Sequence, residues 1–316
     1  MRKPFRFAAV YGTALTLFFV FVLLDAFVFP RPQAAVAPVA ALAPVIPSPP
    51  AASDIAAASP SPEVSAEPVI TGDSYQDENI QITVETIRKY DTTLYVADIR
   101  LSDPSLLRTA LAEDTFGRNI TDTTSDMAEL HNAVFAVNGD YYGFREAGWV
   151  LRNGVLYRDT PYDGADALVI GKDGDLSVIG DDADITEYDD AWQIFSFGPA
   201  LVEDGEIAVN ENSEISGRSS GSNPRTAIGQ AGELHYIVIV SDGRAAGETG
   251  LSLYQLAGEF AERGCSVAYN LDGGGSSTMV LNGVVINDPV GGGGWGRRGG
   301  NSSERKVSDI VYVGYE

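Results

Sequence analysis

The stretch SLYQLAGEFAERGCSVAYNLDGGGSSTMVLNGVVIN, residues 252–287, decides what kind of fold this chain forms. Its first twelve residues place leucine, alanine and phenylalanine on one helical face, with Ser252 and Gln255 as a capping box and Gly264 as the stop. Residues 265–272 have the pattern of a buried strand, and residues 278–287 that of a hairpin turning at Asn282–Gly283. A helix that leads into a strand and then a hairpin predicts an α+β domain.

The pattern of a short apolar run, a tight turn and a second run recurs through the rest of the chain. The turns fall at Tyr90–Asp91, Asn153–Gly154, Asp173–Gly174 and Asp204–Gly205. Asn, Asp and Gly suit such turns because they tolerate positive φ. A second helix is expected over residues 125–133, with Ser125 as its N-cap, followed by the strand NAVFAVN. We therefore predict one mixed, hairpin-rich sheet domain of the α+β class with few helices, rather than a sandwich or a doubly wound sheet.

The N-terminus has the features of a membrane-targeting segment. Arg2, Lys3 and Arg6 precede an apolar run over residues 7–29 that is long enough to cross a bilayer. A cleaved signal peptide is the alternative, because residues 35–37 form a small-x-small site, although Pro38 follows it directly. We expect an uncleaved signal anchor over residues 1–30 in the cell membrane. Everything after it would then be extracellular, or secreted if the segment is cleaved.

The segment after the anchor is almost entirely Ala, Pro, Val and Ser, which cannot bury enough apolar surface to fold. We expect a disordered linker over residues 31–73 that acts as a stalk, and a single catalytic or binding domain over residues 74–316.

Charge and composition narrow the possible partners. Forty-four acidic against 21 basic residues give a net charge of −23, which opposes binding to nucleic acid. One cysteine and two histidines exclude a disulfide framework and argue against an ordinary zinc site, so no cofactor is predicted. Cys265 is expected to be a small buried apolar residue.

Polar residues gather where two of the expected strands end. One strand ends at Asn270 and Asp272 and is followed by GGGSS, which lacks the lysine and the following helix of a nucleotide-binding loop. The glycines leave backbone N–H groups sterically open, while a merely flexible loop is the alternative interpretation. The other strand ends in Asn138, Gly139 and Asp140.

Aromatic residues follow the second of these strand ends, at Tyr141 and Tyr142. Aromatic faces pack on sugar rings, and a pair of carboxylates such as Asp140 and Asp272 is the minimal equipment for cleaving a glycosidic bond. For Asp140 the alternative is a turn residue that bonds its own backbone.

Arginines stand at other strand ends, where they suit an anionic substrate, because guanidinium groups bind phosphate oxygens in a bidentate fork. Arg225 and Arg305 are the main candidates, and Arg244 closes another expected strand. Surface ion pairing is the alternative, and we prefer it for Arg297, Arg298 and Lys306.

Taken together, these motifs resemble, in the same order, the phosphodiester glycosidase family, which includes the lysosomal uncovering enzyme and bacterial envelope proteins labelled as exopolysaccharide biosynthesis proteins. The resemblance covers residues 133–316 and rests on NGDYY (138–142), NPRTAIG (223–229), SDGR (241–244), the helix at 252–263, NLDGGGSSTM (270–279) and ERKVSDIVYV (304–313). The resemblance implies hydrolysis of a sugar 1-phosphodiester, of the N-acetylglucosamine type, at the glycosidic C–O bond.

The resemblance also suggests roles for individual residues. We expect Asp272 and Asp140 to be the catalytic carboxylates and Arg225 to clamp the phosphate. The expected substrate-binding residues are Asn138, Gly139, Tyr141, Asp242, Arg244, Asn270, Gly273, Gly274, Gly275, Ser276, Ser277 and Arg305. Which aspartate attacks and which protonates stays open, as does retention or inversion, because the outcome depends on the separation of the carboxylates.

The substrate and two rival functions also stay open at this point. The anchor and the Pro/Ala-rich linker favour a cell-envelope polysaccharide or a teichoic-acid-like polymer as substrate. The segment after SDGR and the glycine-rich loop before Arg305 depart from the family pattern, which leaves substrate choice undecided. One rival function is a non-catalytic protein that binds anionic glycan. The other is a metal-dependent phosphodiesterase with Asp140, Asp242 and Asp272 as ligands.

Overall fold

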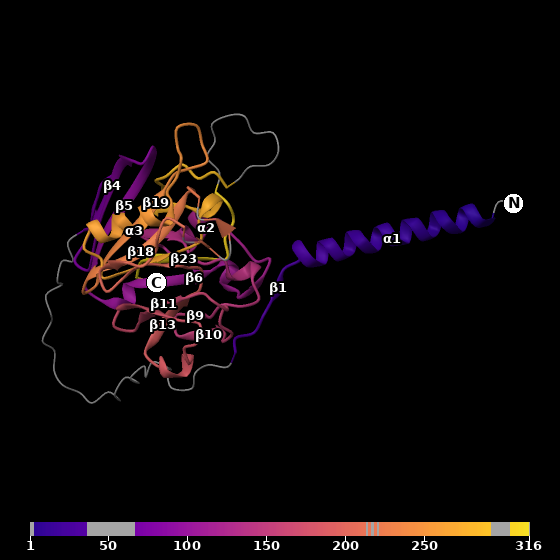
Figure 1. Ribbon diagram of the computed structural model, residues 1–316, viewed down its shortest axis with the longest axis horizontal. Coiled ribbons are helices and arrows are strands. Elements are labelled where there is room, and N and C mark those ends of the chain that lie inside the picture. The colour runs from indigo at the N-terminus through magenta and orange to yellow at the C-terminus, as the bar shows by residue number, and fades with distance from the viewer. Residues whose placement is uncertain are drawn as a thin grey trace, which may run out of the picture.

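Antiparallel sheets make up most of the fold (Figure 1). The computed structural model describes residues 3–36, 67–212, 214–215, 218–219, 221–291 and 304–315. Within these ranges the α-helices are α1 (Lys3–Phe27), α2 (Thr124–Leu130) and α3 (Leu253–Glu262). Short 3-10 turns lie at η1 (Pro104–Leu106), η2 (Ala112–Asp114), η3 (Tyr142–Phe144), η4 (Ile185–Glu187) and η5 (Gly274–Ser276). The α+β class is confirmed.

The largest sheet has nine strands in the order β15-β14-β20-β18-β19-β5-β4-β3-β2. Their bounds are β2 (Val69–Ile70), β3 (Ser74–Gln76), β4 (Ile80–Lys89), β5 (Thr92–Leu101), β14 (Ala200–Glu203), β15 (Glu206–Ile207), β18 (Arg225–Gly232), β19 (His235–Ser241) and β20 (Val267–Asn270). Ile80, Ile82 and Val84 of β4 are buried while the residues between them are exposed, as strand alternation requires.

Two five-stranded sheets complete the domain. One has the order β22-β21-β8-β23-β6 and is formed by β6 (Leu107–Leu111), β8 (Phe135–Asn138), β21 (Met279–Leu281), β22 (Val284–Val285) and β23 (Asp309–Val313). The other has the order β10-β9-β13-β11-β12 and is formed by β9 (Val150–Arg152), β10 (Val155–Arg158), β11 (Ala167–Gly171), β12 (Leu176–Ile179) and β13 (Ala191–Phe195). A separate two-stranded ribbon joins β16 (Glu214–Ile215) and β17 (Arg218–Ser219). The strands of the hairpin-rich domain are thus divided among several sheets.

The main core lies where the three large sheets face one another, and it includes Ile228, Phe135 and Phe195. Helix α3 covers the opposite face of the nine-stranded sheet, where Phe260 and Cys265 are buried. A Cβ at Gly229 of β18 would lie 2.7 Å from the Phe260 ring, so glycine permits this close helix-to-sheet contact. Helix α2 covers the outer face of the β22-to-β6 sheet.

The five hairpins expected from turn residues all form. Asn153 and Gly154 have φ of 49° and 74°, and Tyr90 and Asp91 take positive φ although neither is glycine. The capping box of Ser252 and Gln255 is present on α3. The N-cap of α2 is Thr123 rather than Ser125, because the Thr123 hydroxyl accepts the Asp126 N–H. Ser125 instead bonds Glu304.

The N-terminal helix α1 contains an 18-residue window, Val10–Phe27, that is apolar enough to cross a membrane. It is a candidate membrane anchor or signal sequence. After it, β1 (Arg31–Pro32) pairs with β7 (Gly117–Arg118) of the domain. Most of the expected linker, residues 37–66, lies outside the described residues. Strand β2 begins at Val69, so the described sheet starts five residues before the domain boundary expected at residue 74.

Candidate active site

Strands β8 and β20 come from different sheets and end side by side. The Asp272 N–H donates to the Gly139 carbonyl at 3.0 Å, and the Asn138 side-chain amide donates to the Asp272 carbonyl. The Asn138 amide oxygen accepts the Thr226 hydroxyl at 2.8 Å and the Thr278 N–H at 3.2 Å. Buried Asn138 therefore joins the two sheets and fixes Asp140 and Asp272 next to one another.

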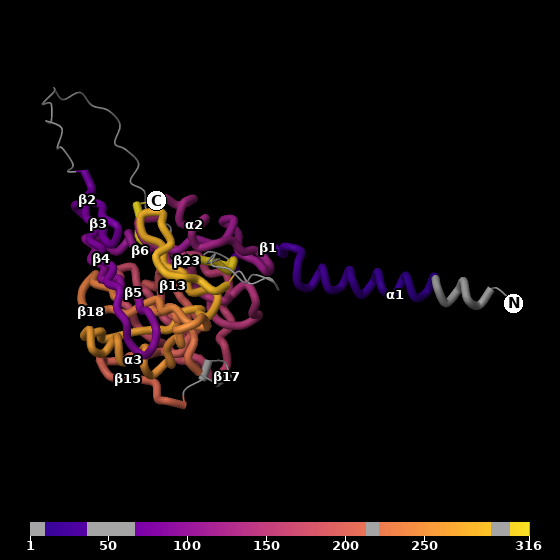
Figure 2. Tube along the Cα trace, turned by 90° about the horizontal axis from the view of Figure 1, so that it is seen from above, coloured from indigo at the N-terminus to yellow at the C-terminus, as the bar shows by residue number. Residues whose placement is uncertain are grey.

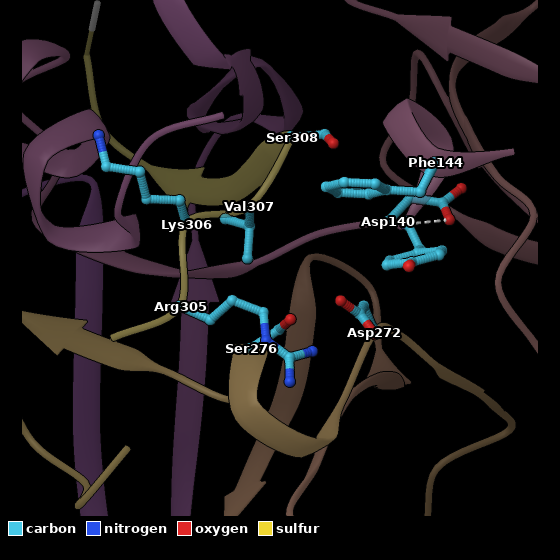
Figure 3. Close-up of a pocket in the computed structure, with 9 residues that line it drawn as sticks. Asp140, Phe144, Asp272, Ser276, Arg305, Lys306, Val307 and Ser308 are labelled. Atoms are coloured by element: carbon cyan, nitrogen blue, oxygen red, sulfur yellow. Dashed lines mark hydrogen bonds between the residues drawn. The ribbon is translucent and has the colours of Figure 1, made fainter. Parts of the chain in front are cut away.

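A pocket of about 340 Å³ opens between these strand ends (Figure 3). It is lined by Asp140, Tyr141, Phe144, Asp272, Ser276, Arg305, Lys306, Val307 and Ser308. Arg305 points its guanidinium toward Ser276 and Asp272, whereas Lys306 extends away from them in Figure 3. Lys306 pairs with Asp122, in keeping with the surface ion pair expected for it. The pocket thus contains both carboxylates and one of the predicted arginines.

Asp140 is held by an array of donors. One carboxylate oxygen accepts the Tyr141 N–H and an Arg145 guanidinium N–H, the latter at 3.0 Å. The other oxygen accepts the Ser196 N–H at 2.9 Å. Arg145 is itself fixed by the Ser196 carbonyl and by three aromatic rings, Tyr141, Tyr162 and Phe197, with centroids 5.1–5.8 Å from its guanidinium carbon. The Tyr141 N–H contact confirms a local turn, yet Asp140 also faces the pocket.

A buried ion pair lies behind Asp140. Arg152 contacts the carboxylate of Asp309 through Nε at 2.8 Å and through a terminal nitrogen at 2.7 Å. Asp309 in turn accepts the Asp140 N–H at 2.7 Å. A Cβ at Gly139 would lie 2.6 Å from Asp309, so glycine at 139 allows this carboxylate to reach the Asp140 backbone. The pair orients the Asp140 loop from the side away from the pocket.

Asp272 has an unusual titration. Burial raises its pKa to about 6, against the lowering effects of the Ser276 hydroxyl, the Arg305 charge and the Gly273 N–H. Burial also raises the pKa of Asp309 to about 6. A carboxyl group with a pKa close to neutrality, in a pocket, is suited to proton transfer or to activation of water.

This titration predicts a stability effect. Because the folded-state pKa of Asp272 is higher than the ordinary aspartate value, folding stability decreases as the pH rises from about 4 to about 6 and stays lower above that. Asp272→Asn removes the buried charge, so we expect it to stabilise the protein by about 1–2 kcal/mol at pH 8 and by almost nothing at pH 4. Thermal unfolding at the two pH values measures the difference, with exposed Asp288→Asn as the control. An equal effect of Asp272→Asn at both pH values would contradict the assigned titration.

The glycine triplet packs closely against its surroundings. Gly274 has φ of 65°, and its N–H donates to the Pro224 carbonyl at 2.8 Å. A Cβ at Gly275 would lie 2.6 Å from an Arg305 guanidinium nitrogen and 2.8 Å from Gly291 Cα. The loop forms the short turn η5 and opens no helix, as expected from the strand pattern that follows it. The glycines therefore give Arg305 access to the pocket.

The aromatic wall differs from the expected pair. Tyr141 lines the pocket, but its stacking partner is Phe144, with ring centroids 4.7 Å apart. Tyr142 is buried, packs on Phe116 and donates its hydroxyl to the Ser308 carbonyl. The interpretation of Tyr142 as a sugar-stacking residue is therefore wrong, because its ring belongs to the core.

Arg225 and Arg244 lie beyond the glycine loop and do not line the described pocket. Adjacent strand residues face opposite sides, so Thr226 faces Asn138 while Arg225 points toward the α3 side, where its Nε donates to the Leu251 carbonyl. Burial and the nearby Arg244 charge lower the pKa of Arg225 to about 10. Arg244 donates to the Asn223 side chain and lies against Gly274.

Three other predicted residues have structural contacts away from the pocket. Asp242 accepts the Tyr95 hydroxyl and the Asp288 N–H, and burial raises its pKa. Asn270 donates to the Gly198 carbonyl, and the Ser277 carbonyl accepts the Asn287 amide. Within the described residues no three His, Cys, Asp or Glu side chains are placed to hold a metal ion, so Asp140, Asp242 and Asp272 do not form the alternative metal site.

Sequence reasoning missed Arg145, Arg152, Phe144 and Asp309. Asp309 had a detectable signal, because it is a carboxylate at the start of a buried strand. Asp140 and Asp272 likewise adjoin buried strands, but they follow them. Arg145 follows the NGDYYGF motif directly, but nothing local indicates that it folds back onto Asp140. Arg152 looked like an ordinary residue before a hairpin turn.

The sequence of this chain is similar to those of several known proteins. A Bacillus subtilis protein, the SPbeta prophage-derived uncharacterized protein YomE, is 33% identical over 210 residues, which are 63% of this chain and 31% of that protein. The mouse N-acetylglucosamine-1-phosphodiester alpha-N-acetylglucosaminidase is 34% identical over 100 residues, covering 28% of this chain and 19% of the enzyme. The chain thus spans about a third or less of the length of these relatives.

A solved structure has the same fold. The zebrafish N-acetylglucosamine-1-phosphodiester alpha-N-acetylglucosaminidase catalytic domain, described as auto-inhibited by its pro-peptide, superposes with a TM-score of 0.59 at 22% identity. The match covers 75% of this chain and 83% of that chain. The family model for phosphodiester glycosidase matches residues 131–314, which contain both pocket aspartates, the glycine loop and Arg305. With more than half of its residues matched, this chain belongs to the phosphodiester glycosidase family.

Proposed function

We propose that the protein hydrolyses a sugar 1-phosphodiester, of the N-acetylglucosamine type, at the glycosidic C–O bond. One observation carries this proposal: Asp140 and Asp272 line the same pocket as Arg305 and the stacked Tyr141–Phe144 pair. The pocket therefore combines carboxylates for the anomeric centre, a cation for the phosphate and an aromatic surface for the sugar ring.

Asp272 and Asp140 take different roles in this proposal. Asp272, with its pKa near 6, acts in the ionised form, either by attacking the anomeric carbon or by activating the water that does. Both oxygens of Asp140 already accept hydrogen bonds, which makes Asp140 a weaker nucleophile. Its negative charge instead stabilises the positive charge that develops on the sugar in the transition state.

The leaving group is the phosphate monoester, which needs little protonation. Arg305 and the Ser276 hydroxyl lie beside Asp272, so we assign them to the phosphate oxygens. Arg225, expected from the sequence to clamp the phosphate, takes a positioning role in this proposal, because its guanidinium fixes the carbonyls of Leu251 and Gly221 beside the glycine loop.

The relatives support the chemistry and leave the substrate to be proposed. The mouse and human relatives are named for action on N-acetylglucosamine-1-phosphodiesters. By extension, we propose that the substrate of this chain is a sugar 1-phosphodiester of the cell envelope. In this proposal α1 is a membrane anchor and the domain lies outside the cell.

Hydrolysis of a soluble probe tests the proposal. We expect the full-length protein to release reducing sugar from the methyl ester of N-acetylglucosamine 1-phosphate, and to do so equally well in EDTA. Binding of the probe without release would favour the non-catalytic alternative. Loss of activity in EDTA would favour the metal-dependent phosphodiesterase.

Arg145 gives a separate prediction about Asp140. Arg145→Met removes the guanidinium that pairs with this carboxylate, so we expect kcat to fall about ten- to a hundredfold with a smaller change in KM. Arg145→Lys keeps the charge and should restore part of the loss. Steady-state kinetics on the methyl ester measure both variants, with Arg100→Met, an exposed residue paired with Asp98, as the control. Full activity in Arg145→Met would show that Asp140 does not depend on this arginine.

A further inference from the structure

The end of α1 is attached directly to the domain beside the pocket. Helix α1 ends at Phe27, and β1 (Arg31–Pro32) then pairs with β7 (Gly117–Arg118). Figures 1 and 2 both show β1 at the junction between α1 and the domain. The chain is therefore bound to the domain before residues 37–66 begin.

Several contacts build this junction. The Gln33 N–H donates to the Phe116 carbonyl at 2.9 Å. The Asn119 side chain donates to the Phe29 carbonyl at 3.1 Å and to the Ala26 carbonyl at 3.3 Å. A Cβ at Gly117 would overlap the Arg31 carbonyl, so glycine is needed for β1 to lie on β7. The junction thus uses backbone and side-chain hydrogen bonds on both sides of β1.

The junction adjoins the pocket through η3. A Cβ at Gly143 would lie 3.5 Å from the Gly117 carbonyl, and the next residue, Phe144, lines the pocket. Three residues, Val28 to Pro30, lie between Phe27 and Arg31, so the four residue steps span at most about 14 Å. If α1 crosses the membrane, the pocket therefore lies close to the bilayer surface, whatever the length of the segment after residue 36.

The contacts also favour a retained helix over a cleaved one. Cleavage after the small-x-small site at residues 35–37 would remove β1 and leave β7 without its partner strand. Val28 and Phe29 at the helix end and Phe144 at the pocket are more than 40% exposed, as suits side chains at a bilayer interface. Arg305 and Lys306 supply positive charge at the pocket of an otherwise acidic protein.

From this placement we propose that the substrate is a membrane lipid, in which one phosphate joins the anomeric oxygen of a sugar to a lipid alcohol. The inference rests on the proposed function. Water supplies the oxygen that bonds to the anomeric carbon, the bond from that carbon to the phosphate oxygen breaks, and the lipid phosphate monoester leaves. The products are the free sugar, the lipid phosphate and one proton, shared according to pH between solvent and the phosphate. Because β1 holds the domain close to the bilayer surface, the domain hydrolyses lipid headgroups rather than a polymer that only a long stalk would let it reach.

Spacer insertions test the proposal in full-length protein reconstituted in phosphatidylcholine vesicles. One variant carries a 20-residue Gly/Ser spacer between Phe29 and Pro30. This spacer separates β1 from the end of α1 by a root-mean-square distance of about 25 Å. The matched control carries the same spacer within residues 37–66, which follow β1 in the chain. Both are assayed on the hexadecyl ester of N-acetylglucosamine 1-phosphate in the vesicles and on its soluble methyl ester.

We expect the spacer at residue 29 to lower kcat/KM for the hexadecyl ester by roughly tenfold, because the effective concentration falls with tether length. Activity on the methyl ester should stay unchanged, and the control spacer should change neither activity. Equal effects of the two spacers, or no effect of either, would overturn the lipid-substrate inference while the methyl-ester activity still supports the glycosidase. If no protein hydrolyses the methyl ester, the proposed function itself fails and the inference fails with it.

Discussion

Asp272→Asn is expected to lower kcat/KM for a sugar 1-phosphodiester by about 10³-fold or more, the largest effect of any single substitution in the pocket. The asparagine keeps the shape of the side chain, but it neither attacks an anomeric carbon nor accepts a proton from water. The same substitution is expected to stabilise the fold at pH 8, so loss of activity would coincide with a higher melting temperature. Misfolding would instead lower both the activity and the melting temperature.

The pH dependence of the unmodified protein follows from the same group. Since Asp272 acts when ionised and burial raises its pKa to about 6, kcat/KM should fall about tenfold per pH unit below pH 6. A pH profile on the methyl ester measures this limb. Asp166→Asn is the matched control, because Asp166 is another largely buried carboxyl group with a raised pKa, and it lies outside the pocket. Normal activity in Asp272→Asn, or equal losses in both variants, would remove Asp272 from the reaction.

Arg305→Met is expected to lower kcat/KM for the phosphodiester by about 10²- to 10³-fold, because it removes a preorganised cation from the developing phosphate charge. The effect should depend on the substrate. An aryl glycoside of the same sugar has no phosphate to bind, so the substitution should change its hydrolysis by less than about tenfold.

A second readout separates phosphate binding from a general disturbance of the pocket. The Arg305 charge lowers the pKa of Asp272, so its removal should move the acidic limb of the pH profile to higher pH. Arg305→Lys should keep the limb in place and recover part of the activity, since a lysine provides charge without the bidentate geometry. Equal losses on both substrates with an unmoved limb would contradict the phosphate role.

Local signals in the sequence were sufficient for the hairpins and for α3. Positive φ at Asn153–Gly154 and the capping box at Ser252 depend on residues only a few positions apart. Asp140 and Asp272 were also singled out, because each follows an apolar strand; the Asp272 N–H bond to the Gly139 carbonyl and the Asn138 side chain hold the two strand ends, which come from different sheets, next to one another.

The missed residues make contacts that no local pattern encodes. Arg152 reaches Asp309 only after separate sheets have packed, whereas Arg145 contacts Asp140, five positions before it, because the loop after β8 folds back. The orientation of Arg225 follows from strand alternation once the structure shows that Thr226 faces Asn138, because adjacent strand residues face opposite sides. Pairing of β1 with β7 joins two-residue strands whose sequences, Arg-Pro and Gly-Arg, have little strand character.

The position of the broken bond tests the glycosidase assignment most directly. Full-length protein is incubated with the methyl ester of N-acetylglucosamine 1-phosphate in ¹⁸O-water, and both products are analysed by mass spectrometry before the free sugar exchanges its anomeric oxygen. Cleavage of the C–O bond predicts ¹⁸O in the sugar and none in methyl phosphate. Label in methyl phosphate would show P–O cleavage and contradict the account.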